Sequence, residues 1–226
     1  AVGFKALKEN TSGAENTAVG QTALDANTTA NYNTAVGSQS LSNNTTGAGC
    51  TGVGRAALNA NTTASNNTAV GYNAMLDTTI GDHNVAVGSY ALDANTVGDR
   101  NVALGVNALT SMDAPSKQDV YNTAVGYDSL QATTSGQTNT AVGGNTLRSN
   151  TTGNDNVAVG YSALYAMTAG IRNTAVGVNA LASNTANENT AIGRKALYAN
   201  TIGVSNVGVG VGALEQNTTG SGNVAI

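Results

Sequence analysis

The sequence has 226 residues, a net charge of −4 and only 10% charged residues, and its nine Lys and Arg are scattered along the chain. Without a basic stripe to follow phosphates we expect no nucleic-acid partner, and no apolar run is long enough to insert into a membrane. One cysteine excludes an intrachain disulfide framework, while 28 glycines with one proline and no tryptophan are unlike an ordinary globular protein.

A short motif, Ala-Val-Gly in most of its copies, recurs at a nearly constant interval. Ten of the twelve intervals between its glycines equal 17, one equals 21 and one equals 16. Its glycines are Gly3, Gly20, Gly37, Gly54, Gly71, Gly88, Gly105, Gly126, Gly143, Gly160, Gly177, Gly193 and Gly210. A fixed short period indicates stacked coils. We therefore predict an all-β, parallel β-solenoid with 17 residues per coil and about 13 coils, forming a single segment over residues 1–226 of a longer chain.

Each repeat begins with a short predicted strand, for example residues 16–20. Thr17 and Val19 are two residues apart and share one face, whereas Ala18 faces the other way. We expect Val19 and its equivalents Val36 and Val70 to be buried in the coil. The alternative is that alanine faces inward and threonine and valine face outward, in which case the rod could be a monomer.

The alanine of this strand is replaced only by glycine along the chain, which indicates close packing against something. With valine inside, the alanines would lie on the outer wall and form a lengthwise contact between identical chains. This predicted oligomer face consists of Ala18, Ala35, Ala69, Ala86, Ala103 and Ala124.

The glycine after the strand predicts a bend with positive φ or a close backbone approach. A small residue and a leucine follow, and Leu24, Leu41 and Leu58 are expected in the core. Apolar residues five positions apart make no helical stripe, so a helical repeat is disfavoured.

The remaining residues of each repeat are of the types that favour turns. Asn-Thr-Thr-Gly or a close variant recurs, and its asparagines Asn10, Asn27, Asn44, Asn61, Asn150 and Asn217 also match the glycosylation sequon. We favour a role of these asparagines in turns over glycosylation. A second asparagine precedes the strand at 12 of 13 positions, with Cys50 as the exception, and predicts a ladder of amides between coils.

The longest interval, from Gly105 to Gly126, contains an insertion, residues 111–121, that holds the only proline. An insertion in a solenoid is extruded as a loop, and such loops often carry binding. Its candidate recognition residues are Asp113, Lys117, Asp119 and Tyr121; the alternative is a neutral insertion.

At Asn-Thr-Ala-Val-Gly-x-x-Ala-Leu the sequence resembles the head repeats of YadA-like trimeric autotransporter adhesins, and it is also similar to shaft repeats of phage tail fibres. The resemblance rests on one short motif, and the period of this chain is longer than the period typical of those heads. It implies a left-handed β-roll, a homotrimer, and a location outside the cell, on the cell surface or on a virion.

Nothing in the sequence indicates catalysis or a cofactor. His83 is the only histidine, and Cys50 has no histidine partner in the pattern. We expect a structural, non-enzymatic fibre or stalk segment that mediates attachment to a cell-surface or glycan receptor. The alternatives are an ice-binding solenoid with a threonine plane, a glycan-binding solenoid that uses outward tyrosines such as Tyr72 and Tyr161, or a self-assembling extracellular filament subunit.

Overall fold

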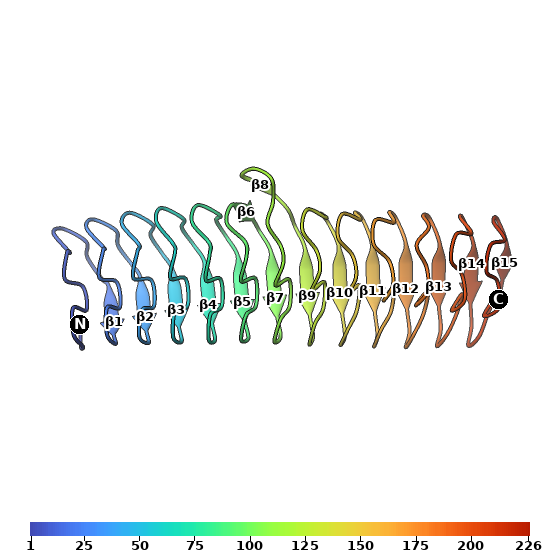
Figure 1. Cartoon of the computed structure of the whole chain (residues 1–226), viewed down its shortest axis with the longest axis horizontal. Helices are drawn as coiled ribbons and strands as arrows, with labels where there is room; N and C mark the ends of the chain where they lie inside the picture. Colours follow the sequence, from blue (N-terminus) through green and yellow to red (C-terminus); the bar gives the residue numbers. More distant parts are fainter. The chain divides into compact units, whose positions relative to one another are not determined.

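The computed structural model describes residues 1–226 and consists of short strands and turns, without a helix. The chain forms two compact units, residues 1–120 and 121–226, which are described separately below. In both units, parallel strands follow one another at the spacing of the sequence repeat, as Figure 1 shows by the strand labels. The predicted all-β solenoid fold is therefore confirmed, whereas its handedness remains a prediction from the resemblance.

The first unit contains one ladder of parallel strands in register and one separate pair. Each strand of the ladder pairs with its equivalent in the next coil, so that Thr17 lies beside Thr34 and Val19 beside Val36. The ladder consists of β1 (Thr17–Val19), β2 (Thr34–Val36), β3 (Thr51–Val53), β4 (Thr68–Val70), β5 (Val85–Val87) and β7 (Val102–Leu104). The separate pair is β6 (Gly98–Asp99) and β8 (Gln118–Asp119).

The second unit repeats the same arrangement of parallel strands in register. Its strands are β9 (Thr123–Val125), β10 (Thr140–Val142), β11 (Val157–Val159), β12 (Thr174–Val176), β13 (Thr190–Ile192), β14 (Val207–Val209) and β15 (Val224–Ala225). The shortened repeat that ends near Gly193 keeps the register, because Val176 pairs with Ile192. The missing residue is therefore absorbed outside the strand.

The buried and exposed faces of the strands are exchanged relative to the preferred expectation. Ala18 is 1% exposed, whereas Val19 is 41% exposed and Thr17 is also exposed. The predicted burial of Val19, Val36 and Val70 is wrong, and that of Leu24, Leu41 and Leu58 is confirmed. The predicted oligomer face is likewise wrong, because all six of its members are buried inside their own chain: Ala18, Ala35, Ala69, Ala86, Ala103 and Ala124.

The reason for this reversal is the narrow coil. The inner face of each strand lies directly against the Ala-Leu turn of the same chain, so there is room for a single methyl group. At Gly208, a Cβ atom would lie 3.1 Å from the carbonyl oxygen of Ala213 and 3.4 Å from Cγ of Leu197. The close partner that explains the small residue is therefore the turn of the chain itself. A charge at Ala86 would enter the interior instead of interrupting an interface.

The turn after the strand depends on left-handed backbone conformations. The glycines that follow the strands have positive φ, as expected, for example +139° at Gly20, where a Cβ would lie 2.4 Å from the carbonyl oxygen of Gly37 in the next coil. The buried leucines also adopt positive φ, for example 51° at Leu24, and Met75 has 52° at the equivalent position. The residues of this turn are therefore constrained both by the close stacking of the coils and by the sharp bend of the backbone.

Two columns of buried asparagine amides fill the remaining interior. In the column that precedes the strands, the Asn33 backbone N–H donates to Oδ1 of Asn16, and its Nδ2 donates to the carbonyl oxygen of Gly47. This ladder confirms the sequence prediction. In the second column, Nδ2 of Asn44 donates to Oδ1 of Asn27, and both residues are fully buried. The sequon asparagines of the corner are thus structural, as the turn interpretation predicted.

Candidate functional site

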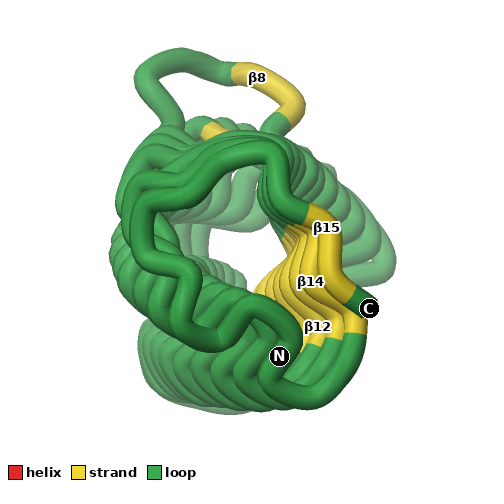
Figure 2. Tube along the Cα trace, turned by 90° about the vertical axis from the view of Figure 1, so that its right-hand side faces the viewer, coloured by secondary structure: helices red, strands yellow, loops and turns green.

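The outer face of each strand ladder is an uncharged stripe of valine and threonine. In the second unit Val142, Val159, Val176 and Ile192 form one exposed column, and Val157 extends it sideways. Neither outward strand position carries a charged residue in any repeat. We call this surface the strand face; Figure 2 shows the strands gathered on one side of the coil. A column of exposed aliphatic side chains of this kind is characteristic of an interaction site.

The insertion in the first unit lies outside the outline of its coils, but it is anchored to them. Its strand β8 pairs with β6, and Met112, Ala114 and Val120 are buried. The loop with β8 projects from the corner in Figures 1 and 2, as the sequence predicted. Three buried apolar residues and a strand pair therefore hold the projecting loop in place.

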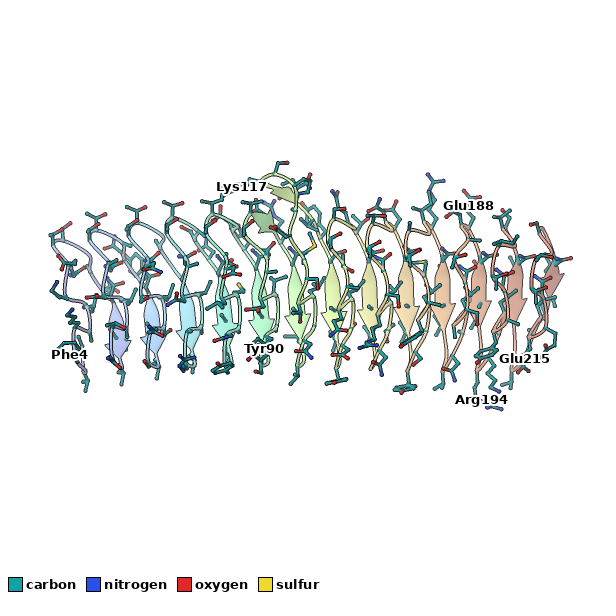
Figure 3. All side chains as sticks on the ribbon, in the orientation of Figure 1. Phe4, Tyr90, Lys117, Glu188, Arg194 and Glu215 are labelled. Atoms are coloured by element: carbon teal, nitrogen blue, oxygen red, sulfur yellow. The ribbon has the colours of Figure 1, made fainter.

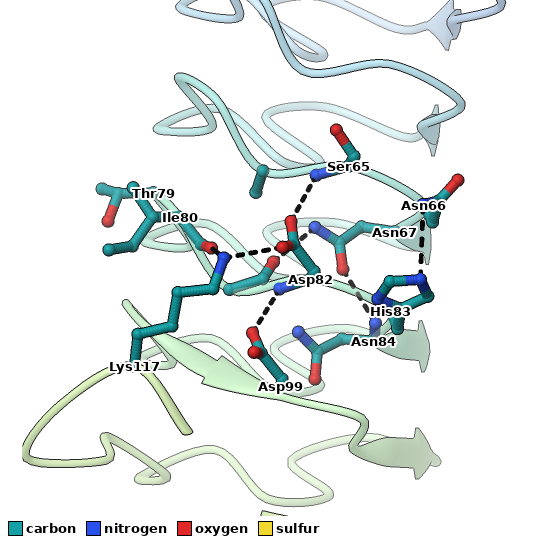
Figure 4. A network of polar contacts seen from close by, with 12 residues as sticks. Ser65, Asn66, Asn67, Thr79, Ile80, Asp82, His83, Asn84, Asp99 and Lys117 are labelled. Carbon is teal, nitrogen blue, oxygen red and sulfur yellow. Dashed lines mark hydrogen bonds and ion pairs between the residues drawn. The ribbon is translucent and has the colours of Figure 1, made fainter. Parts of the chain in front are cut away.

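The candidate recognition residues of the loop bind the chain itself. Lys117 donates from Nζ to the Ile80 carbonyl oxygen at 2.7 Å and forms an ion pair with Asp82 at 2.6 Å (Figure 4). Thr96 donates from Oγ1 to Oδ1 of Asp113 at 2.6 Å.

Asp119 forms an ion pair with Arg100, and Tyr121, the first residue of the second unit, is 52% exposed. Asp113, Lys117 and Asp119 therefore already have partners that anchor the loop. Recognition by these residues remains a prediction.

His83 and Cys50, the two residues considered for catalysis, lie beside asparagines of the coil. Nε2 of His83 lies 3.4 Å from Nδ2 of Asn66 at the corner. Cys50 is buried in the asparagine ladder, where its backbone N–H donates to Oδ1 of Asn33. Burial raises the pKa of the Cys50 thiol to about 11, although the backbone N–H of Asn67 opposes this rise. A thiol with this pKa is a poor nucleophile at neutral pH.

Acidic residues do not assemble into a metal centre in the described chain, since no group of three His, Cys, Asp or Glu could hold an ion. One pair of carboxylates does interact in the first unit. Burial raises the pKa of Asp93 to about 6, and the charge of Asp77 raises it further. Oδ1 of Asp93 also has no hydrogen-bond partner. This arrangement destabilises the ionised side chain and suggests no reaction.

The second unit contains a groove of about 550 Å³ along the turns that follow the strands. These turns lie on the edge where Arg194 and Glu215 are labelled in Figure 3, opposite the corner that carries Glu188. The groove is lined by tyrosines, amides, hydroxyls and one ion pair: Asp128, Asn145, Arg148, Tyr161, Ser162, Tyr165, Ala166, Asn179, Ala182, Ser183 and Tyr198. We call this surface the tyrosine groove.

An ion pair between Arg148 and Asp128 lies at one end of the tyrosine groove and is held by further hydrogen bonds. Nε of Arg148 donates to Oδ2 of Asp128 at 3.2 Å, and its guanidinium also donates to the Tyr165 hydroxyl at 3.2 Å. The Asp128 side chain is only 5% exposed. The Tyr165 hydroxyl and, more weakly, Asp128 raise the pKa of Arg148, so its guanidinium stays protonated.

Sequence reasoning finds part of this groove and misses the rest. The sequence predicts that Tyr161 faces outward, and this residue is 56% exposed. The column of Arg148, Tyr165, Ala182 and Tyr198 is not among the sequence predictions, although these residues recur at the repeat spacing. A comparison of the same position in successive repeats is the signal that reveals it.

Comparisons with known protein families, curated proteins and solved structures found no significant match. No segment of the structure forms a helix with the length and apolarity that crossing a bilayer requires. The strand face and the tyrosine groove are therefore interpreted from their own geometry and chemistry.

Proposed function

We propose that this chain is a structural, non-enzymatic segment of an extracellular or virion fibre that mediates attachment, and that identical chains associate lengthwise through their strand faces. The single observation that carries this proposal is the uncharged apolar column of Val142, Val159, Val176 and Ile192, with its equivalent in the first unit. The resemblance to adhesin heads and tail-fibre shafts supports an extracellular or virion location and association as a homotrimer.

A second copy of the chain is the partner that fits this surface best. The strand face contains no charge that would select an unlike partner, and every coil repeats threonine or valine at one position and valine, leucine or isoleucine at the other. The seven strands of the second unit extend the face over roughly 30 Å, since neighbouring strands lie about 4.8 Å apart. A standard interface buries about 800 Å² per partner, and a stripe of this length is suitable for such a contact.

The test is the mass of the protein in solution, measured by light scattering over a range of concentrations. Val159→Lys should dissociate the assembly, because a lysine would be buried without a partner at the centre of the contact. Val178→Lys is the matched control: Val178 is 44% exposed but lies outside the strands. If the parent protein is monomeric at every concentration, or if both variants dissociate equally, the proposed assembly is wrong.

Ice binding is a second candidate, and the outward threonines favour it. The preferred expectation from the sequence placed this column inside the coil, whereas Thr17, Thr34, Thr51 and Thr68 face outward in register. The column is interrupted by Val85 and Val102 in the same unit. Thermal hysteresis measurements test this candidate: ice binding requires hysteresis that disappears in Thr51→Lys, and a solution without hysteresis excludes it.

A further inference from the structure

We infer that the tyrosine groove of the second unit binds a neutral oligosaccharide. The groove is concave and lies on the turn segments that follow the strands, and its lining contains no residue of the strand face that we assign to assembly. It combines exposed aromatic rings, which can stack against a ligand, with amides and hydroxyls, which can form hydrogen bonds to it. Its shape, its polar lining and its charge each point to this class of ligand.

The shape of the groove depends on one small residue between two tyrosines. Tyr165, Ala182 and Tyr198 occupy the same position in three successive coils, as the backbone bonds from Ala166 to Ala182 and from Ser183 to Tyr198 show. The backbones that carry the two tyrosines are two coil spacings apart, roughly 10 Å. Ala182 leaves an open notch between them, and both rings are partly exposed. A flat ring with apolar C–H faces fits such a notch by stacking against tyrosine.

The polar lining supplies paired donors and acceptors at the spacing of the coils. Asn145, Ser162 and Asn179 occupy one column along the groove, and Ser183 lies beside the notch. All four side chains are partly exposed, and each amide offers both a donor and an acceptor. Neighbouring hydroxyls of a sugar require this combination, whereas a purely apolar ligand would make no hydrogen bonds to these groups.

The charge of the groove favours a neutral ligand. Its only cation, Arg148, is paired with the buried Asp128. Just beyond the groove, Lys195 lies 3.6 Å from Glu215 and over the Tyr198 ring. An acidic sugar or a phosphate would need a cation that is not already neutralised, and the exposed Arg194 beside Lys195 does not line the groove. The lining residues extend over five coils, or roughly 19 Å, so an extended chain of sugars can follow the groove.

The test uses the whole chain and an array that carries short neutral oligosaccharides, including cello-, malto- and chito-oligosaccharides, beside sialylated and sulfated ones. We expect neutral oligosaccharides to bind, and the binding to be quantified by calorimetry. Tyr165→Ser should weaken the affinity on the order of tenfold, since loss of one stacked ring is worth about 1.4 kcal/mol. Ala182→Tyr should abolish binding, because a third tyrosine would fill the notch.

The controls distinguish a variant that has lost the binding site from one that no longer folds. Tyr32→Ser removes a tyrosine at a corner of the first unit that is more exposed than Tyr165, 62% against 36%, and should leave the affinity unchanged. Circular dichroism of each variant should match that of the parent. The inference is overturned if only acidic sugars or peptides bind, if no neutral oligosaccharide binds, or if a folded Ala182→Tyr variant binds as the parent does. These outcomes do not depend on the assembly, which is measured by mass.

Discussion

Oδ1 of Asn61 has no hydrogen-bond partner because the next residue in its buried column is Thr78. The Asn61 amide donates to Oδ1 of Asn44 at 2.7 Å, but Thr78 has no amide with which to continue the series. The Thr78 hydroxyl is itself without a partner. Two buried polar atoms are therefore unsatisfied at this break in the column, and each such atom is costly.

Replacing Thr78 with asparagine should stabilise the protein. The new amide would donate to Oδ1 of Asn61, and its own oxygen could accept from Asn95 in the following coil. We expect a gain of about 1 kcal/mol in the free energy of unfolding, measured by urea denaturation. Thr78→Val is the control, since it removes the unsatisfied hydroxyl but leaves Asn61 unpaired. If Thr78→Val is the more stable of the two variants, the amide column contributes no stability here.

Substitutions of Leu130 should separate packing from backbone conformation. Leu130 is fully buried with φ of 51°, a region that β-branched residues strongly disfavour. Leu130→Ala should cost on the order of 2–5 kcal/mol by leaving a cavity.

Leu130→Met should be nearly neutral, because Met75 adopts the same conformation at the equivalent position. Leu130→Ile keeps the volume and should nevertheless be clearly destabilised in thermal unfolding. If isoleucine and methionine are tolerated equally well, the left-handed conformation is not a constraint at this position.

A methyl group at Gly126 should disrupt the stacking of coils. Its Cβ would lie 2.4 Å from the carbonyl oxygen of Gly143, and φ is +136°. Gly210→Ala is a matched control, with φ of 126° but no atom closer than 4.0 Å to the new Cβ. Both variants carry a backbone strain of about 1–3 kcal/mol, but only Gly126→Ala adds a clash with the next coil. We expect a much lower thermal midpoint for Gly126→Ala; equal midpoints would contradict the clash.

The stability of the protein should fall between about pH 4 and pH 6 through Asp93. Burial and the charge of Asp77 raise the pKa of Asp93 to about 6, so the folded state holds this proton more tightly than the unfolded state. The stabilisation is complete below the unfolded pKa and is lost as the pH rises through the folded pKa.

Asp93→Asn should remove this part of the pH dependence and be more stable than the parent at neutral pH. The difference between the two urea midpoints, followed across this pH range, isolates Asp93 because the other carboxylates are common to both proteins. A difference that stays constant with pH would show that Asp93 does not titrate in this window.

Much of the fold follows from local chemistry that recurs in every repeat. The period predicted the stacked coils, the glycine after each strand predicted positive φ, and the asparagine before each strand predicted the amide ladder, including its interruption at Cys50. These features depend on residues close in sequence or one period apart. A repeat places those residues beside one another once stacking is assumed.

The sequence alone determined the repeat unit and its turns, whereas the tertiary structure decided which face of the strand is inside. Alternation assigns Ala18 and Val19 to opposite faces without saying which face is buried. The turn that holds Leu24 approaches the strand so closely that only alanine fits, and valine is therefore outside. The notch at Ala182 likewise exists only because stacking places Tyr165 and Tyr198 on either side of it.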